Sequence, residues 1–313
     1  MDPFVLTIII IFVTGITISI LRTTVKDPCL KDFRKDSSVI LMKNEKPVFG
    51  KLELKSSGLI LHYHEPYESA DHYESSFIIY KSEFAAIKNV IRIVSDLDET
   101  ESRRRNIRSL LIKKSFFSSV RRFLRNVFAL LRDSLVDTFR LFIGRTSPKS
   151  SILSSGGTYI NKVGESFVDY VGNAYDPILE KLIGREIVVE ISENGQWKEF
   201  TGILRNYSKD FLEVLSIEMP VTLELPLVKS VLEKFKISID FSENDRTIIN
   251  NKRKSGLKID LNGSIEVVES GKSFEIENFS SVKTFSLVIK EEMDVIFPRS
   301  DAIVRHNTPE ASK

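Results

Sequence analysis

Apolar and polar residues alternate along several parts of this 313-residue chain, most clearly in its second half. From Ile187 to Ile191 every second residue is apolar, which predicts a half-buried β-strand. Asn194 and Gly195 follow, and this pair favours a two-residue hairpin turn because both central positions need positive φ. Gly202 interrupts the next apolar stretch, where a sharply bent sheet needs a residue without a side chain. The pattern therefore predicts consecutive antiparallel strands.

The first half of the chain follows the same plan. Gly50 precedes the apolar residue Leu59 by nine positions, as Gly202 precedes Phe211 by nine. The two stretches predict an internal duplication, with a first β-rich unit over residues 36–95. Two unrelated β domains that alternate by chance are the alternative.

A basic segment between the two β-rich parts predicts an amphipathic helix over residues 103–145. It contains twelve basic residues and two acidic ones. Apolar residues recur at every third or fourth position, so they form one stripe, and arginines lie beside or opposite it. Such a helix suits the anionic inner leaflet of a bilayer. The predicted membrane contacts are Phe116, Val120, Arg121, Arg122, Phe123, Arg125, Phe128, Arg132 and Phe139.

Two other interpretations of this helix stay open. It can pack its apolar stripe on the protein's own core and leave its arginines in water. It can also bind nucleic acid, although several phenylalanines on one stripe are more than phosphate contact needs.

The first 25 residues predict a membrane anchor. Residues 4–21 contain no charged side chain, and as a helix they would rise about 27 Å, close to the roughly 30 Å hydrocarbon core. Basic residues follow at once, among them Arg22 and Lys26. The positive-inside rule then puts the bulk of the chain in the cytoplasm and the N-terminus outside. We predict one uncleaved span in the inner (plasma) membrane, with a buried core helix as the alternative.

The remaining segments are divided by composition. Residues 146–157 have linker composition, and residues 158–183 predict helices. The second β-rich unit covers 184–304, with a β insertion at 221–294 in which Asn262 and Gly263 predict a hairpin. Residues 305–313 form a tail.

Composition and charge add few chemical candidates. The chain is 42% hydrophobic and 28% charged with a net charge of +2, as in ordinary folded proteins. Cys29 is the single cysteine, which excludes an intramolecular disulfide and a zinc site built from several thiolates. His62, His64 and His72 are metal-ligand candidates, but surface imidazoles are the commoner case. No GxxxxGK[ST], GxGxxG or HExxH motif is present. We therefore predict no catalytic residue, no metal site and no cofactor.

Residues 200–215 resemble the first motif of the Sm and Lsm-like family. The matching positions are Gly202, Leu204, Tyr207, Phe211 and Leu215. The family's second motif is an Arg-Gly step between apolar strands, and here Arg299 is kept while Ser300 replaces the glycine. The resemblance implies a small β-barrel and a tendency to oligomerise. Residues 171–190 also resemble an uncharacterised family of bacterial membrane-anchored proteins, which implies no activity.

The same resemblance bears on RNA binding. In the family, RNA is contacted by an Asp just after the aromatic residue and by an Asn in the next strand. This chain has Ser208 and Leu212 at these positions, so two of three ligand positions lack the chemistry that reads a base edge. Nucleic acid is disfavoured, and Tyr207, Lys209 and Arg299 are the candidate contacts to RNA or to another partner.

Together these features predict an α+β protein. It would have an N-terminal transmembrane helix, one or two small Sm-like or SH3-like β-barrels, a basic amphipathic helix between them and a β-hairpin extension near the C-terminus. We expect a membrane-anchored scaffold without catalytic activity that assembles with itself or with a protein partner at the anionic inner membrane surface. The alternative is a membrane-tethered RNA-binding protein.

Overall fold

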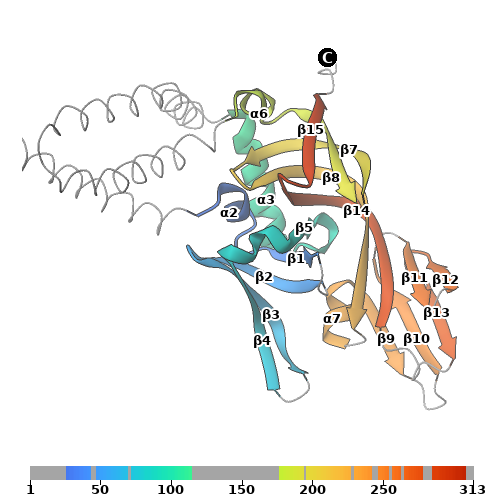
Figure 1. The fold of residues 1–313 in the computed structure, drawn as a ribbon. Coiled ribbons are helices and arrows are strands. Elements are labelled where there is room, and N and C mark those ends of the chain that lie inside the picture. The colour runs from blue at the N-terminus through green and yellow to red at the C-terminus, as the bar shows by residue number, and fades with distance from the viewer. Residues whose placement is uncertain are drawn as a thin grey trace, which may run out of the picture.

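The computed structural model of the chain describes residues 26–43, 47–69, 72–114, 176–193, 195–226, 229–241, 246–253, 256–261, 264–277 and 284–307. Most of these residues lie in antiparallel strands (Figure 1). The elements of the first half are α2 (Pro28–Asp32), β1 (Ser37–Met42), β2 (Val48–Leu54), β3 (Gly58–Ser69), β4 (His72–Tyr80), η1 (Lys81–Ala86), β5 (Ile87–Ile93), η2 (Val94–Asp96) and α3 (Glu99–Lys114).

The second half begins with a short helix and continues in strands. Its elements are α6 (Pro177–Leu182), β6 (Glu186–Glu193), β7 (Gln196–Tyr207), β8 (Phe211–Pro226), α7 (Lys229–Lys234), β9 (Ile237–Phe241), β10 (Arg246–Asn251), β11 (Leu257–Leu261), β12 (Ser264–Val268), β13 (Ser273–Glu277), β14 (Thr284–Pro298) and β15 (Ala302–Asn307).

One 12-stranded sheet dominates the fold, with the order β15-β6-β7-β8-β14-β5-β1-β2-β3-β4 and with β11 and β12 off this path. The path contains the same arrangement twice. In β5-β1-β2-β3-β4 the last strand of the first half pairs with its first strand, and in β15-β6-β7-β8-β14 the last strand of the second half does the same. Pairing between β14 and β5 joins the two runs.

Each run follows a short helix built in the same way. Asp27 caps α2 and Asp176 caps α6, and each carboxylate accepts hydrogen bonds from the first-turn backbone N–H groups. Each aspartate is followed by a proline, which suits the first helical position because it has no N–H to satisfy there. The repetition therefore includes the helices as well as the strand order.

The prediction of small closed barrels is wrong. Strands β8 and β14 pair along almost their whole length, from Pro298 opposite Phe211 to Thr284 opposite Pro226. Both strands extend beyond their neighbours in the sheet into a lobe (Figure 1). This lobe contains β11, β12 and the three-stranded sheet β13-β10-β9. Because the two runs bond to one another, they form one continuous 12-stranded sheet instead of separate barrels, and the described structure is mostly antiparallel β rather than α+β.

The predicted membrane location is also corrected. In the part of the chain that the structure describes, no helix is long and apolar enough to cross a bilayer. The prediction of a single-pass inner-membrane protein with a cytoplasmic bulk therefore finds no support in these helices. The longest of them, α3, has 16 residues and carries both acidic and basic side chains. The predicted span itself, residues 1–25, lies outside the described residues.

Two hydrophobic clusters fill the fold. The larger one lies mainly in the second half and its lobe, and includes Leu204 and Val295. The smaller one is centred on the first half, where Leu30 of α2 and Phe33, the residue after it, are buried with Phe211 and Ile296 of the second half. Helix α2 thus contributes apolar side chains to the region where the two halves meet.

Candidate functional site

The junction of the two halves contains a buried group of charged side chains. Arg92 of β5 lies opposite Asp294 of β14 in the strand register, and both side chains are fully buried. Arg92 donates to Asp294 Oδ2 from Nη2 at 2.7 Å and from Nε at 3.0 Å. Its Nη1 donates to Asp36 Oδ2 at 2.7 Å, and its guanidinium lies 4.2 Å from the centre of the Phe33 ring. One arginine therefore connects strands from both halves with the residues that follow α2.

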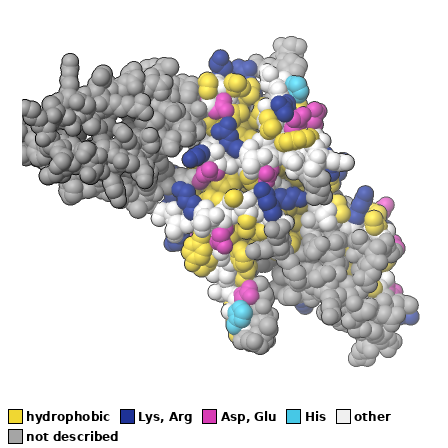
Figure 2. Space-filling model, viewed as in Figure 1, with side chains coloured by type: hydrophobic (Ala, Val, Ile, Leu, Met, Phe, Trp, Pro, Cys, Tyr) yellow, Lys and Arg dark blue, Asp and Glu magenta, His cyan; other side chains and the backbone are white. Residues whose placement is uncertain are grey.

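Helix α3 adds three more arginines to this junction. Arg105 donates to both oxygens of Asp294, at 2.7 and 2.9 Å. Arg104 Nη2 donates to Asp36 Oδ1 at 2.8 Å, and Arg108 Nη1 reaches Asp36 Oδ2 at 3.3 Å. Figure 2, viewed as in Figure 1, shows basic side chains with acidic ones among them over the centre of the face that it draws. In this described part of the predicted basic helix, these three arginines pair inward while Ile107 and Leu110 are exposed.

The start of α3 explains why it lies against the junction. Asp98 Oδ1 accepts the Glu101 N–H at 2.7 Å, and Glu101 Oε2 accepts the Asp98 N–H at 3.1 Å. This reciprocal pair is a capping box, which satisfies two backbone donors at the helix start. Glu101 is buried and also accepts the Ser37 N–H at 3.0 Å. The acidic run before the arginines therefore fixes the helix to β1.

Burial and charge act in opposite directions on the carboxylates. Burial alone would raise the pKa of Asp294, but the hydrogen bonds from Arg105 and the charge of Arg92 outweigh it and lower that pKa. At Asp36 burial prevails over the nearby arginines, and the pKa is raised. Burial, with the negative charge of Asp32, raises the pKa of Glu213 well above its usual value. A hydrogen bond between the Glu213 and Asp32 side chains, which needs a proton on one of them, acts in the same direction.

The two ends of the long sheet are edge strands in the described structure. Strand β4 pairs with β3 on one side, and β15 pairs with β6 on one side. Strand β4 exposes Tyr73, Ile78 and Tyr80 by 75%, 49% and 57%. Edge strands that expose large apolar side chains are ready templates for pairing with another chain. Figure 1 shows β4 in a hairpin that projects from the body, at the other end of the molecule from β15.

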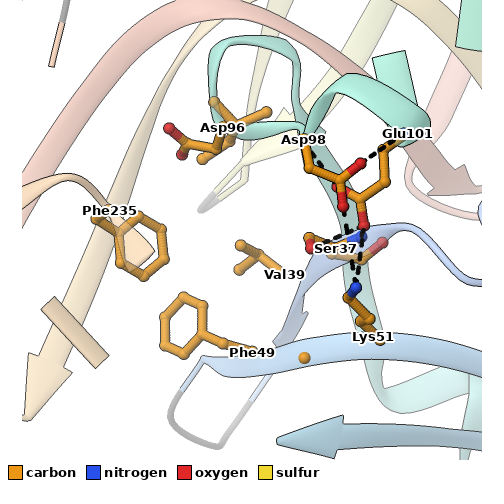
Figure 3. Close-up of a pocket in the computed structure, with 11 residues that line it drawn as sticks. Ser37, Val39, Phe49, Lys51, Asp96, Asp98, Glu101 and Phe235 are labelled. Atoms are coloured by element: carbon orange, nitrogen blue, oxygen red, sulfur yellow. Dashed lines mark hydrogen bonds and ion pairs between the residues drawn. The ribbon is translucent and has the colours of Figure 1, made fainter. Parts of the chain in front are cut away.

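A pocket of about 240 Å³ lies between β1, β2, the start of α3 and Phe235 (Figure 3). Phe49 and Phe235 form its apolar wall, with ring centres 4.8 Å apart in an edge-to-face arrangement. On the polar wall, Lys51 Nζ lies 3.9 Å from Glu101 Oε1 and 4.0 Å from Asp98 Oδ2. Carboxylates therefore compensate the lysine on this side. Glu101 Oε1 also accepts the Ser37 hydroxyl at 3.1 Å and the Ser37 N–H at 3.0 Å, so this carboxylate is shared between β1 and Lys51.

The candidate RNA or partner contacts are mostly engaged inside the second half. Tyr207 is buried, and its hydroxyl is hydrogen-bonded to Glu180 Oε2 at 2.8 Å. Arg299 Nη2 donates to Asp176 Oδ2 at 2.9 Å and Nη1 to the Ser208 carbonyl at 3.3 Å. Lys209 is exposed. Tyr207 and Arg299 thus hold α6 against the strands, which leaves Lys209 as the exposed member of the set.

The remaining candidates are the predicted membrane contacts and the histidines. The predicted membrane contacts, Phe116 to Phe139, lie outside the described residues. His62 Nε2 lies 2.8 Å from Glu53 Oε2, and His72 Nε2 lies 3.4 Å from Glu74 Oε1. Among the residues that the structure describes, no group of three or more His, Cys, Asp or Glu side chains is arranged to hold a metal ion.

The junction residues are not among the sites that the sequence predicted. Arg92 stands within an apolar strand, and Asp294 directly precedes the apolar residues "VIF". A charged residue in or beside an apolar stretch is a usable signal for a buried ion pair. The spacing of Asp98 and Glu101 is a usable signal for the capping box. Comparison of the chain with known protein families, curated proteins and solved structures finds no match.

Proposed function

We propose that this chain is a non-catalytic interaction protein that assembles with further copies of itself through the two ends of its long sheet. The observation that carries the proposal is the β14–β5 pairing inside the chain. In the repeated strand order, β14 holds the place of β4 and β15 holds the place of β5. The edge strands β4 and β15 are therefore the counterparts of β14 and β5, the two strands that pair at the junction.

The register of the internal junction indicates which residues would meet. Ile296 of β14 lies opposite Val90 of β5. Ile78 corresponds to Ile296, because each stands three residues before the basic residue of a similar turn, Lys81-Ser82-Glu83 or Arg299-Ser300-Asp301.

The other side of the contact follows in the same way. Ile40 corresponds to Val189, because each stands two residues after the residue that lies opposite Gly50 or Gly202. Val304 then corresponds to Val90, because Val90 lies opposite Ile40 and Val304 lies opposite Val189. The same pairing between copies would place Ile78 of one copy opposite Val304 of the next.

The backbone of β4 is suitably oriented for this contact. Lys81 N–H donates to the Ser57 carbonyl at 2.8 Å, so the alternate residues Ile79 and Phe77 face β3 and Ile78 turns its N–H outward. The sequence of β4 has no lysine or proline, which are the residues that commonly block an edge. Because the two edges differ, contact between copies is head-to-tail and produces a ring or an open chain.

A pair of introduced cysteines tests this arrangement in the full-length protein. Ile78→Cys combined with Val304→Cys should give disulfide-linked dimers and larger species after mild oxidation. The matched control is Ile265→Cys with Val304→Cys, since Ile265 is also exposed, at 65% against 49% for Ile78, but lies on β12. The single native cysteine is buried and does not compete.

Sedimentation velocity gives the independent measurement. The wild-type chain should show a mass above one chain that rises with concentration, and Ile78→Pro should return it to a monomer because proline removes the outward N–H. A wild-type chain that stays monomeric at every soluble concentration would refute the proposal. So would cross-linking of the control pair to the same extent.

A further inference from the structure

A second depression, of about 390 Å³, lies beside Lys51 and gathers positive charge. Its cationic lining residues are Arg34, Lys35, Lys51 and Arg104, with one carboxylate, Glu53, and His62. They come from the turn that follows α2, from β2 and β3, and from the first turns of α3. We refer to this depression as the cationic groove.

The one carboxylate in the groove is already neutralised by neighbours. Glu53 forms an ion pair with Lys55 and lies 2.8 Å from His62 Nε2. Hydrogen bonds from these two residues lower the pKa of Glu53 to about 2. Its negative charge is therefore committed to Lys55 and His62 and does not offset the other cations of the groove.

The cations differ in how firmly they are held. Arg104 is fixed by its bonds to Asp36 and to the Lys35 carbonyl, at 2.8 and 3.1 Å. Lys51 is bounded by two carboxylates at 3.9 and 4.0 Å. Arg34 and Lys35 are exposed, and within the described residues their side chains have no ion-pair partner. Two anchored cations thus lie beside two that are available to a ligand.

The backbone at Lys35 fixes the place where its side chain leaves the chain. Lys35 has φ of 69°, in the left-handed region that favours glycine. Its N–H donates to the Leu52 carbonyl at 2.7 Å, which fixes the chain against β2. The same turn follows α6, where Gly184 has φ of 78° and donates to the Leu204 carbonyl at 2.7 Å. The first half therefore carries a long cationic side chain where the second half has glycine.

We propose that the cationic groove binds a small molecule that carries a phosphate or pyrophosphate group. Its volume lies within the roughly 300–1,000 Å³ of small-molecule sites. Arg34 supplies a planar guanidinium suited to two phosphate oxygens, and Lys35 and Lys51 supply point charges. The inference is independent of assembly through the sheet edges, because the groove lies on α2, β2, β3 and α3.

Calorimetric titration of the full-length protein with inorganic pyrophosphate and with inorganic phosphate tests the proposal. We expect saturable binding of pyrophosphate that weakens as salt is added, since the groove is open to solvent. The triple variant Arg34→Gln, Lys35→Gly, Lys51→Gln should bind at least about tenfold more weakly. Glycine at position 35 keeps the backbone conformation, so this variant is designed to fold.

The matched control removes three exposed lysines elsewhere: Lys229→Gln, Lys252→Gln and Lys258→Gln. It has the same net charge as the triple variant and should bind like the wild type. Absence of saturable binding of either anion to the wild type would overturn the proposal, as would equal weakening in the control. Single-stranded RNA that binds with the same dependence on the groove residues, while pyrophosphate does not, would overturn it in favour of a polyanion. If the triple variant loses its circular dichroism spectrum, Lys35→Gly alone must still weaken pyrophosphate binding.

Discussion

Arg92 Nη2 lies 2.7 Å from Asp294 Oδ2, and these two fully buried side chains stand opposite one another across the pairing of β5 with β14. They are 202 positions apart in the sequence. Asp294 also lies where the register of β14 against β8 shifts, and it accepts the Ser216 N–H at 3.1 Å. Asp294 therefore joins Arg92 to the β-bulge at which β8 and β14 change register.

Replacement of Arg92 by methionine should destabilise the fold strongly. It would leave Asp294 and Asp36 buried without their shared cation, and breaking a buried ion pair from one side costs about 3–5 kcal/mol. Urea denaturation of both proteins measures the difference. The control Arg246→Met removes an exposed partner of Glu275, for which we expect a loss within about 1 kcal/mol. Equal losses in the two variants would mean that Arg92 is not an essential member of the junction.

The Glu213 carboxyl should make stability depend on pH. Its pKa is raised in the folded chain, so the folded state holds a proton that the unfolded state releases above the usual value of 4.5. Stability contributed by this group is therefore lost as the pH rises from that value through the folded pKa. Glu213→Gln should stabilise the protein at neutral pH, since the amide stays uncharged beside Asp32. The gain should vanish below pH 4.5.

Thermal unfolding at a series of pH values checks this expectation. Glu218→Gln is the matched control, because Glu218 lies on the same strand but is exposed. It should leave the pH profile unchanged. A Glu213→Gln profile parallel to that of the wild type at every pH would contradict the assignment.

The Cys29 thiol should be chemically silent in the folded protein. It is fully buried and lies 3.8 Å from the Phe211 carbonyl. Burial, followed by the nearby charges of Asp27 and Glu213, raises its pKa well above the usual value, so little thiolate forms. A chromogenic thiol reagent should detect one thiol per chain only after denaturation. Leu110→Cys, at a position 68% exposed, should react at once, and equally rapid reaction of the wild type would contradict the burial of α2.

The local features of the sheet could be predicted from the sequence, because they depend on neighbours in the chain. Strands β6 and β7 pair with Glu193 opposite Gln196, on either side of the predicted turn at Asn194 and Gly195. Gly195 has φ of 78°, the value that such a turn requires. Strands β11 and β12 likewise pair with Leu261 opposite Ser264.

The joining of the two halves could not be predicted in this way. Whether a run of five strands closes on itself or bonds to another run depends on contacts between β5 and β14, which are far apart in the chain. The apolar stripe and the positive charge of the basic segment predict a surface for lipid. In α3, the described part of this segment, the charge of Arg105 is instead used by Asp294, a residue that no local pattern connects with it.

The two glycines that suggested a duplication provide the last prediction. A Cβ at Gly202 would meet a methyl group of Val214 and the Leu215 carbonyl, and a Cβ at Gly50 would meet the His62 carbonyl. In both halves the second strand thus passes close to the backbone of the third. Gly202→Ala should cost about 1–3 kcal/mol of unfolding free energy.

Gly50→Ala should cost more than Gly202→Ala, because a carbonyl fixed in the β2–β3 ladder cannot rotate away as a valine methyl group can. Chemical denaturation of the single variants measures both costs. Gly256→Ala is the control, since its Cβ would meet only the Val268 carbonyl, at an ordinary 3.7 Å, and it should change stability by less than about 0.5 kcal/mol. If alanine at either position is tolerated like alanine at 256, the close approach of the second and third strands is not required in that half, and the two halves do not share this feature.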